Sequence, residues 1–196
     1  MKGAGDAALL RRGLRLEYVT LGWNVVGTVV VVLAALAARS VALAGFGLDS
    51  LIEIFASVIV VWQLTGADDR RERIAIRLIG LAFFALALYI VGQTAYALAA
   101  HVHPGPSIRG IVWLAATFVV MLLLAYGKLV TGRKIGNPVL MTESRVTLID
   151  AVLAGAVLVG LVLNAVLGWW FTDPLAGLVI VYYAIREGMG AMRGEA

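Results

Sequence analysis

Cysteine is absent from the 196-residue sequence, and histidine occurs only twice. The lack of cysteine excludes disulfide bonds and any metal site built from thiolates. Charged residues are also scarce, at 14%, whereas 62% of the residues are hydrophobic. A soluble domain of this length needs more polar surface, so the composition predicts an all-α integral membrane protein that crosses the bilayer several times.

The basic residues do not indicate nucleic-acid binding, although the formal net charge is +4. They lie between apolar stretches, as the topology of a membrane protein requires. The basic N-terminal region has no short apolar core followed by a cleavage site, so we expect no removable signal peptide. No nucleophile–base pair or cofactor motif is visible, so we expect neither an enzyme nor a prosthetic group.

Six apolar segments are each close to the roughly 20 residues that cross the hydrocarbon core of a bilayer. We expect transmembrane helices at residues 18–38, 41–64, 74–99, 108–130, 144–168 and 174–191. They would form a single six-helix domain over residues 1–196, without a soluble domain. The connection at Arg39 and Ser40 is very short, which predicts that the first two helices form an antiparallel pair.

The lysines and arginines predict the orientation of these helices. All of them except Arg39 and Arg109 fall on one side of the predicted topology. That side includes Lys128, which flanks the basic connection at residues 131–138. Because basic residues concentrate in cytoplasmic loops, both termini are predicted to be cytoplasmic in a multi-pass cell-membrane protein.

Asp49 and Glu53 are the most unusual residues of the predicted second helix. They are four positions apart in an otherwise apolar run, so both project from one helical face. An ionised carboxylate near the centre of a membrane-spanning helix costs about 2.5–3.5 kcal/mol. With a rise of about 1.5 Å per residue, Glu53 and Asp150 of the fifth helix fall at the same depth, roughly 18 Å below the outer boundary. Asn24 of the first helix falls near that level too.

Three acids and an amide near mid-membrane predict an oxygen-rich cation site. Such ligands suit divalent ions such as Zn²⁺, Mn²⁺, Co²⁺ or Fe²⁺, and protons would compete with the ion for the carboxylates. The other interpretation is a hydrogen-bonded cluster of protonated carboxyl groups that holds the helices together. Three acids at matched depth on two helices favour the cation site.

Other polar residues have less specific patterns. Glu143 lies two turns before the acid of the fifth helix on the same face, and Glu17 stands at the start of the first helix. Both fit a cytoplasmic entrance for cations, with Glu143 as a further metal ligand, and both also fit interfacial acids near helix ends. His101 and His103 are more typical of an ordinary loop, and Asp173 of a helix cap.

The stretch Gly47-Leu-Asp-Ser-Leu-Ile-Glu-Ile-Phe-Ala-Ser57 resembles the second helix of the cation diffusion facilitator family. The resemblance covers nearly the whole chain, at Leu16-Glu-Tyr18, Gly22-Trp-Asn24, Gly45-Phe-Gly-Leu-Asp-Ser50, Leu163-Asn-Ala-Val-Leu-Gly-Trp-Trp170, Asp173-Pro174 and Arg186-Glu-Gly188. The chain looks especially similar to the short bacterial branch that lacks a cytoplasmic domain. This resemblance implies a homodimer in the bacterial inner membrane that exports divalent metals in exchange for protons.

The resemblance also implies a metal site formed by Asp49, Glu53 and Asp150. Family members add a fifth-helix histidine and a first-helix acid, whereas this sequence has Val146 and Gly27 at those positions. The leading hypothesis is therefore a proton-coupled divalent-cation transporter that works by alternating access. The alternative is a non-transporting membrane scaffold or partner-binding protein that retains the fold. A channel is disfavoured because no ring of acids or filter-like loop is visible.

Overall fold

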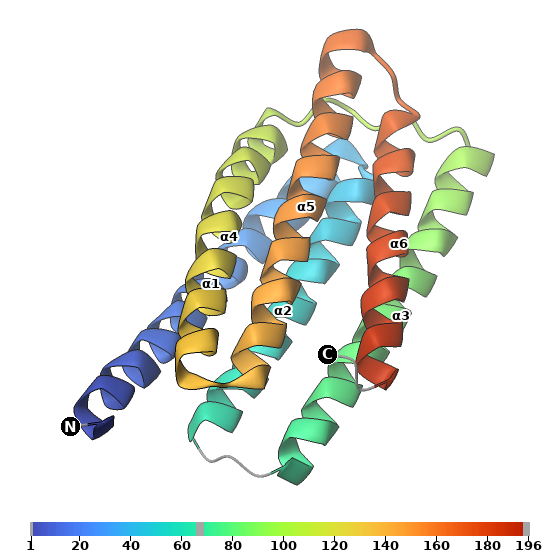
Figure 1. The fold of residues 1–196 in the computed structure, drawn as a ribbon. Coiled ribbons are helices and arrows are strands. Elements are labelled where there is room, and N and C mark those ends of the chain that lie inside the picture. The colour runs from blue at the N-terminus through green and yellow to red at the C-terminus, as the bar shows by residue number, and fades with distance from the viewer. Residues whose placement is uncertain (1, 66–68, 194–196) are drawn as a thin grey trace.

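The computed structural model of the chain describes residues 2–65 and 69–193. These residues form an antiparallel bundle of helices, and no strand occurs among them (Figure 1). The helices are α1 (Lys2–Ala38), α2 (Val41–Thr65), α3 (Asp69–Ala99), α4 (Ile108–Ile135), α5 (Pro138–Leu167) and α6 (Thr172–Arg193). Each contains a segment long and apolar enough to cross a membrane. The prediction of an all-α protein with six membrane-spanning helices is therefore confirmed.

Neighbouring helices pack in pairs, with the most extensive contacts between α4 and α5, α3 and α6, and α1 and α2. The helix α1 begins and the helix α6 ends at the same end of the bundle, which we call the terminal end (Figure 1). The ends of α2 and α4 lie there too. Apolar side chains such as Leu36, Leu88 and Val166 project outward from the bundle, where a bilayer would cover them.

Several helices are longer than the predicted membrane spans, because they extend into the charged segments at the terminal end. The first helix begins at Lys2 rather than residue 18, and α3 begins at Asp69 rather than residue 74, inside the charged connection of residues 66–73 that the sequence has between the second and third predicted spans. Residues 66–68 of that connection lie outside the described part of the chain. Charged residues form helices readily once an adjacent apolar span has nucleated the helix, and the hydropathy pattern does not register them.

The connection between α4 and α5 is also shorter than predicted, and it consists of Gly136 and Asn137. Gly136 ends α4 in the left-handed conformation, with φ of 64°, which glycine adopts without strain. Asn137 caps α5, since its side chain accepts a hydrogen bond from the backbone N–H of Leu140, and Pro138 occupies the first turn. Consequently α4 continues to Ile135, and α5 begins six residues before its predicted start at residue 144.

Candidate functional site

The acids Asp49, Glu53 and Asp150 meet inside the bundle, and we call them the acid trio. Their side chains are only 4%, 1% and 1% exposed. Asp49 and Glu53 project from α2, one turn apart, toward Asp150 on α5, and the carboxyl group of Asp150 interacts with both of theirs. The helix arithmetic that set Glu53 and Asp150 at the same depth therefore agrees with the contact that the structure shows.

Two members of the acid trio, Glu53 and Asp150, make no hydrogen bond of normal geometry, although Glu53 interacts electrostatically with the ammonium of Lys128. Both carboxyl oxygens of Glu53 and both of Asp150 are buried without a hydrogen-bond partner among the described residues. Burying an ionised carboxylate without a partner is strongly unfavourable, and three neighbouring negative charges increase that penalty. The ammonium of Lys128 interacts electrostatically with Glu53, and protons or a bound cation must compensate the remaining charge of the acid trio. A cluster of this kind can exchange one for the other.

The acid trio is not a preassembled metal site. Across residues 2–65 and 69–193, no group of three or more acids or histidines has the geometry to hold a metal ion. A cation at the trio would therefore require the carboxyl groups to turn inward. Asn24 is buried as predicted, but its amide nitrogen donates a hydrogen bond to no described residue, the acids included.

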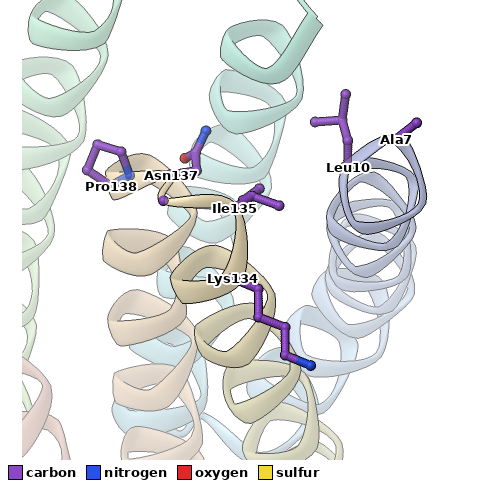
Figure 2. A pocket seen from close by; sticks show the side chains of 7 residues that line it. Ala7, Leu10, Lys134, Ile135, Asn137 and Pro138 are labelled. Atoms are coloured by element: carbon purple, nitrogen blue, oxygen red, sulfur yellow. The ribbon is translucent and has the colours of Figure 1, made fainter. Parts of the chain in front are cut away.

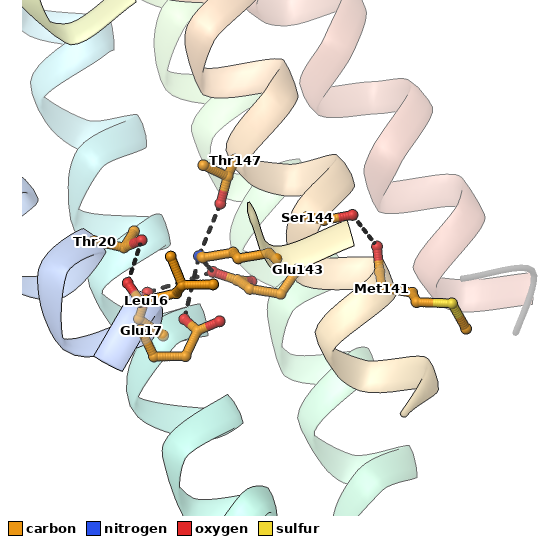
Figure 3. A network of polar contacts seen from close by, with 9 residues as sticks. Leu16, Glu17, Thr20, Met141, Glu143, Ser144 and Thr147 are labelled. Atoms are coloured by element: carbon orange, nitrogen blue, oxygen red, sulfur yellow. Dashed lines mark hydrogen bonds and ion pairs between the residues drawn. The ribbon is translucent and has the colours of Figure 1, made fainter. Parts of the chain in front are cut away.

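A second polar cluster surrounds Lys128, which is fully buried on α4. Its Nζ lies 3.2 Å from Oε2 of Glu17 on α1 and 3.0 Å from Oε1 of Glu143 on α5. The ammonium also donates a hydrogen bond of 2.9 Å to the hydroxyl of Thr147, one turn further along α5. Figure 3 shows Glu17, Glu143 and Thr147 converging from the two helices onto this point. We call these four residues the lysine cluster.

The lysine cluster changes the roles expected for its acids. Glu17 and Glu143 are 0% and 2% exposed, so neither is an interfacial acid at a helix end. In this structure both carboxylates hold the ammonium of Lys128, and Glu143 additionally accepts a hydrogen bond of 3.3 Å from Ser57 of α2. Glu143 is thus paired with a lysine, and electrostatic interaction links Glu53 of the acid trio to both Lys128 and Glu143.

The position of Lys128 inside the bundle is not the one that the sequence predicts. The hydropathy pattern places Lys128 beside a cytoplasmic connection, whereas it lies two turns before the end of α4, inside the bundle. The sequence Gly136-Asn137-Pro138 combines a helix stop with a helix start, and it could have placed the end of α4 at Ile135. With that boundary, a lysine at position 128 falls about 10 Å inside the helix.

His101, His103 and Asp173 make structural contacts at the end of the bundle opposite the terminal end. The ring of His103 packs on Trp170 with centroids 4.8 Å apart, and His101 lies on the same indole at 6.4 Å. Asp173 does act as a cap, but on α2 rather than on its own helix. Its carboxylate accepts hydrogen bonds from the backbone N–H groups of Val41 and Ala42 and from the hydroxyl of Ser40.

Apolar packing fills the two positions where the sequence departs from the cation diffusion facilitator pattern. Val146 is buried in the hydrophobic core. Gly27 lies against the indole of Trp113, so that a Cβ at position 27 would come within 3.1 Å of that ring. Trp113 in turn stacks on Trp23 with centroids 4.9 Å apart, and Trp23 donates a hydrogen bond to Thr117. A larger residue at position 27 would have to displace this aromatic pair.

A pocket of about 470 Å³ opens at the terminal end, between the start of α1 and the turn that joins α4 to α5 (Figure 2). Its lining consists of Ala7, Leu10, Lys134, Ile135, Gly136, Asn137 and Pro138. It therefore includes neither the acid trio nor the lysine cluster. The charged side chains of both clusters are buried in this conformation.

The comparisons with known proteins support a multi-span membrane protein. No protein-family model matches the sequence. Over 153 residues the chain is 25% identical to transmembrane protein 163 of Xenopus laevis, an alignment that covers 72% of this chain and 54% of that protein. The chain thus spans about half the length of the curated relative that it matches. It is a multi-span membrane protein with distant similarity to transmembrane protein 163.

Proposed function

We propose that the protein transports a divalent cation across the bilayer, with the acid trio as its binding site. The observation that carries this proposal is the burial of Glu53 and Asp150 side by side with all four carboxyl oxygens lacking a donor among the described residues. A cluster kept only for helix packing would satisfy these oxygens with neighbouring hydroxyl, amide or backbone groups. Oxygen atoms without donors are instead suited to a hard or borderline divalent cation.

Proton exchange follows from the same carboxyl groups. When the cation leaves, the negative charges of Asp49, Glu53 and Asp150 need another positive partner. Protons from the surrounding water can neutralise these carboxylates. Movement of one group of helices against another would expose the trio to each side in turn. The cation diffusion facilitator family, which the sequence resembles, provides the analogy for this proposed mechanism.

The test is transport by purified protein in liposomes that contain a metal-sensitive dye, with a pH gradient across the membrane. The double substitution Asp49→Asn and Asp150→Asn keeps the size of the side chains and removes two of the carboxylates. We expect it to abolish cation flux, whereas Glu187→Gln, an acid substitution at a half-buried position of α6, leaves flux intact. Flux by the double variant equal to that of the parent would exclude the acid trio as the site.

A membrane scaffold is the second candidate function, and two observations favour it. The described residues contain no preassembled metal group, and apolar packing surrounds Gly27 and Val146. Titration calorimetry in detergent with Zn²⁺, Mn²⁺ and Co²⁺ separates the two candidates. Saturable binding that the Asp49→Asn and Asp150→Asn substitutions remove supports transport, and the absence of binding to all three ions supports the scaffold.

A further inference from the structure

The lysine cluster has the composition of a second cation site. Two carboxylates and a threonine hydroxyl converge on one point, and a serine hydroxyl contacts one of the carboxylates. Oxygen atoms of these types are the ligands that bind hard cations in proteins. In this structure the ammonium of Lys128, a positive charge tethered to α4, occupies that point.

The ammonium fits its surroundings closely. It has three N–H bonds, and three oxygen atoms lie within 3.2 Å of Nζ, on Glu17, Glu143 and Thr147. The charges nevertheless do not balance, since one ammonium faces two carboxylates. The Oε1 atom of Glu17 is also buried without a hydrogen-bond partner among the described residues. The cluster therefore has more acceptor atoms than Lys128 satisfies, and with both carboxyl groups ionised it would carry a net negative charge.

The position of the cluster relates it to the acid trio. Glu143 lies seven residues before Asp150 on α5, and Thr147 lies between them, so these groups follow one face of the helix. Glu53 interacts electrostatically with members of both clusters. The lysine cluster stands on the side of the acid trio that faces the terminal end, because α5 begins at that end (Figure 1).

We propose that the lysine cluster is a second, internal cation-binding site that Lys128 occupies as a tethered counter-ion. A divalent cation moving between the acid trio and the terminal end must displace the ammonium from Glu17 and Glu143. While the ammonium stays in place, it joins α1, α4 and α5 and closes this route. The proposal rests on the transport function proposed above and assigns Lys128 as the residue that controls access to the trio.

The first experiment removes the tethered cation. We compare Mn²⁺ binding by titration calorimetry in detergent for the parent, Lys128→Gln and the double variant Lys128→Gln with Glu143→Gln. At Mn²⁺ concentrations that fill only the acid trio of the parent, we expect Lys128→Gln to bind one more Mn²⁺ per chain, and the double variant to lose that gain. Lys134→Gln is the matched control, since Lys134 is exposed on the same helix, and it should bind as the parent does.

The second experiment uses the unsubstituted protein, so it does not depend on the folding of Lys128→Gln. The lysines of this chain are Lys2, Lys128 and Lys134. Acetylation by an amine-reactive reagent, followed by mass spectrometry of peptides, reports the reactivity of each. We expect saturating Mn²⁺ to increase the acetylation rate of Lys128 severalfold relative to the exposed Lys134, because the displaced ammonium leaves its buried partners.

The outcomes separate this inference from the proposed function. If the parent binds Mn²⁺ at the acid trio while Lys128→Gln gains no site and the acetylation of Lys128 is unchanged, the second site is wrong and the transport proposal survives. If the parent binds no Mn²⁺ but Lys128→Gln gains a site that requires Glu143, the second site stands and the trio fails. An unchanged Lys128 acetylation rate combined with a Lys128→Gln variant that does not fold also overturns the second site.

Discussion

The Nζ atom of Lys128 lies 3.0 Å from Oε1 of Glu143, and both side chains are almost completely buried between α4 and α5. The same ammonium reaches Glu17 on α1 at 3.2 Å. A single lysine therefore pairs with acids from two other helices at a depth where an uncompensated charge is costly. The stability of the bundle should depend on this residue more than on either acid.

The first prediction compares the loss of stability when Lys128 is replaced with the loss when either acid is replaced. Lys128→Gln leaves two buried carboxylates without their cation, so we expect a loss of about 3–5 kcal/mol in the free energy of unfolding. Glu143→Gln and Glu17→Gln each leave one ammonium with one carboxylate, and each should cost less, about 1–3 kcal/mol. Thermal unfolding in detergent measures all three.

Lys134→Gln is the control for this series, since it removes an exposed lysine from the same helix and should change stability by less than about 0.5 kcal/mol. A Lys128→Gln variant that unfolds at the temperature of Lys134→Gln would show that the buried ion pairs contribute nothing. A Glu143→Gln variant less stable than Lys128→Gln would reverse the predicted order.

The second prediction concerns the cap that Asp173 provides to α2. Its carboxylate accepts hydrogen bonds from two backbone N–H groups and from the hydroxyl of Ser40, which in turn accepts one from the N–H of Leu43. Asp173→Ala should therefore destabilise the protein by about 2 kcal/mol, the upper end of the range for helix caps. Ser107→Ala, which removes the cap of α4 on Gly110, should cost about 1 kcal/mol. Equal melting temperatures for the two variants would contradict the role of Asp173 across helices.

The third prediction compares two glycines of α1. A Cβ at Gly22 would meet no atom within 4 Å, so Gly22→Ala should stabilise the helix by up to about 1 kcal/mol. A Cβ at Gly27 would lie 3.1 Å from the ring of Trp113, so Gly27→Ala should lower the melting temperature. Adding Trp113→Leu should reduce that loss. If Gly27→Ala is as stable as Gly22→Ala, then Trp113 moves freely and does not block position 27.

The sequence predicts the six helices and the common depth of Glu53 and Asp150, because both follow from the regular geometry of an α-helix. Hydropathy over about 20 residues locates a span, and a constant rise per residue sets Glu53 level with Asp150. The predicted position of Lys128 depends on the exact residue at which α4 ends. A shift of that end from 130 to 135 moves the lysine from the lipid headgroups into the bundle, and the cap at Gly136 decides it.

Asp173 shows a second limit of sequence reasoning. The residue pair Asp173-Pro174 correctly indicates a helix start, but the carboxylate serves the backbone of α2, more than 130 residues earlier in the chain. Capping preferences are local, whereas the choice of which helix end receives the carboxylate depends on how α6 packs beside the turn between α1 and α2. Local sequence contains no information on that choice.

The last prediction tests whether the acid trio lacks a ligand at Val146. This residue lies one turn before Asp150 on α5 and is buried, so Val146→His would present an imidazole on the face that carries the acid. Imidazole nitrogen favours Zn²⁺, whereas Mn²⁺ prefers oxygen. We expect the variant to bind Zn²⁺ at least about tenfold more tightly than the parent, a gain of about 1.4 kcal/mol, with little change for Mn²⁺.

Calorimetry with each ion measures this gain, and two further variants locate it. Adding Asp150→Asn to Val146→His should remove the gain, because the imidazole and the carboxylate would hold the ion together. Val152→His places the same side chain at an exposed position of α5 and should leave Zn²⁺ binding as in the parent. If Val152→His raises the affinity as much as Val146→His, the ion binds the histidine alone, and position 146 has no special relation to the acid trio.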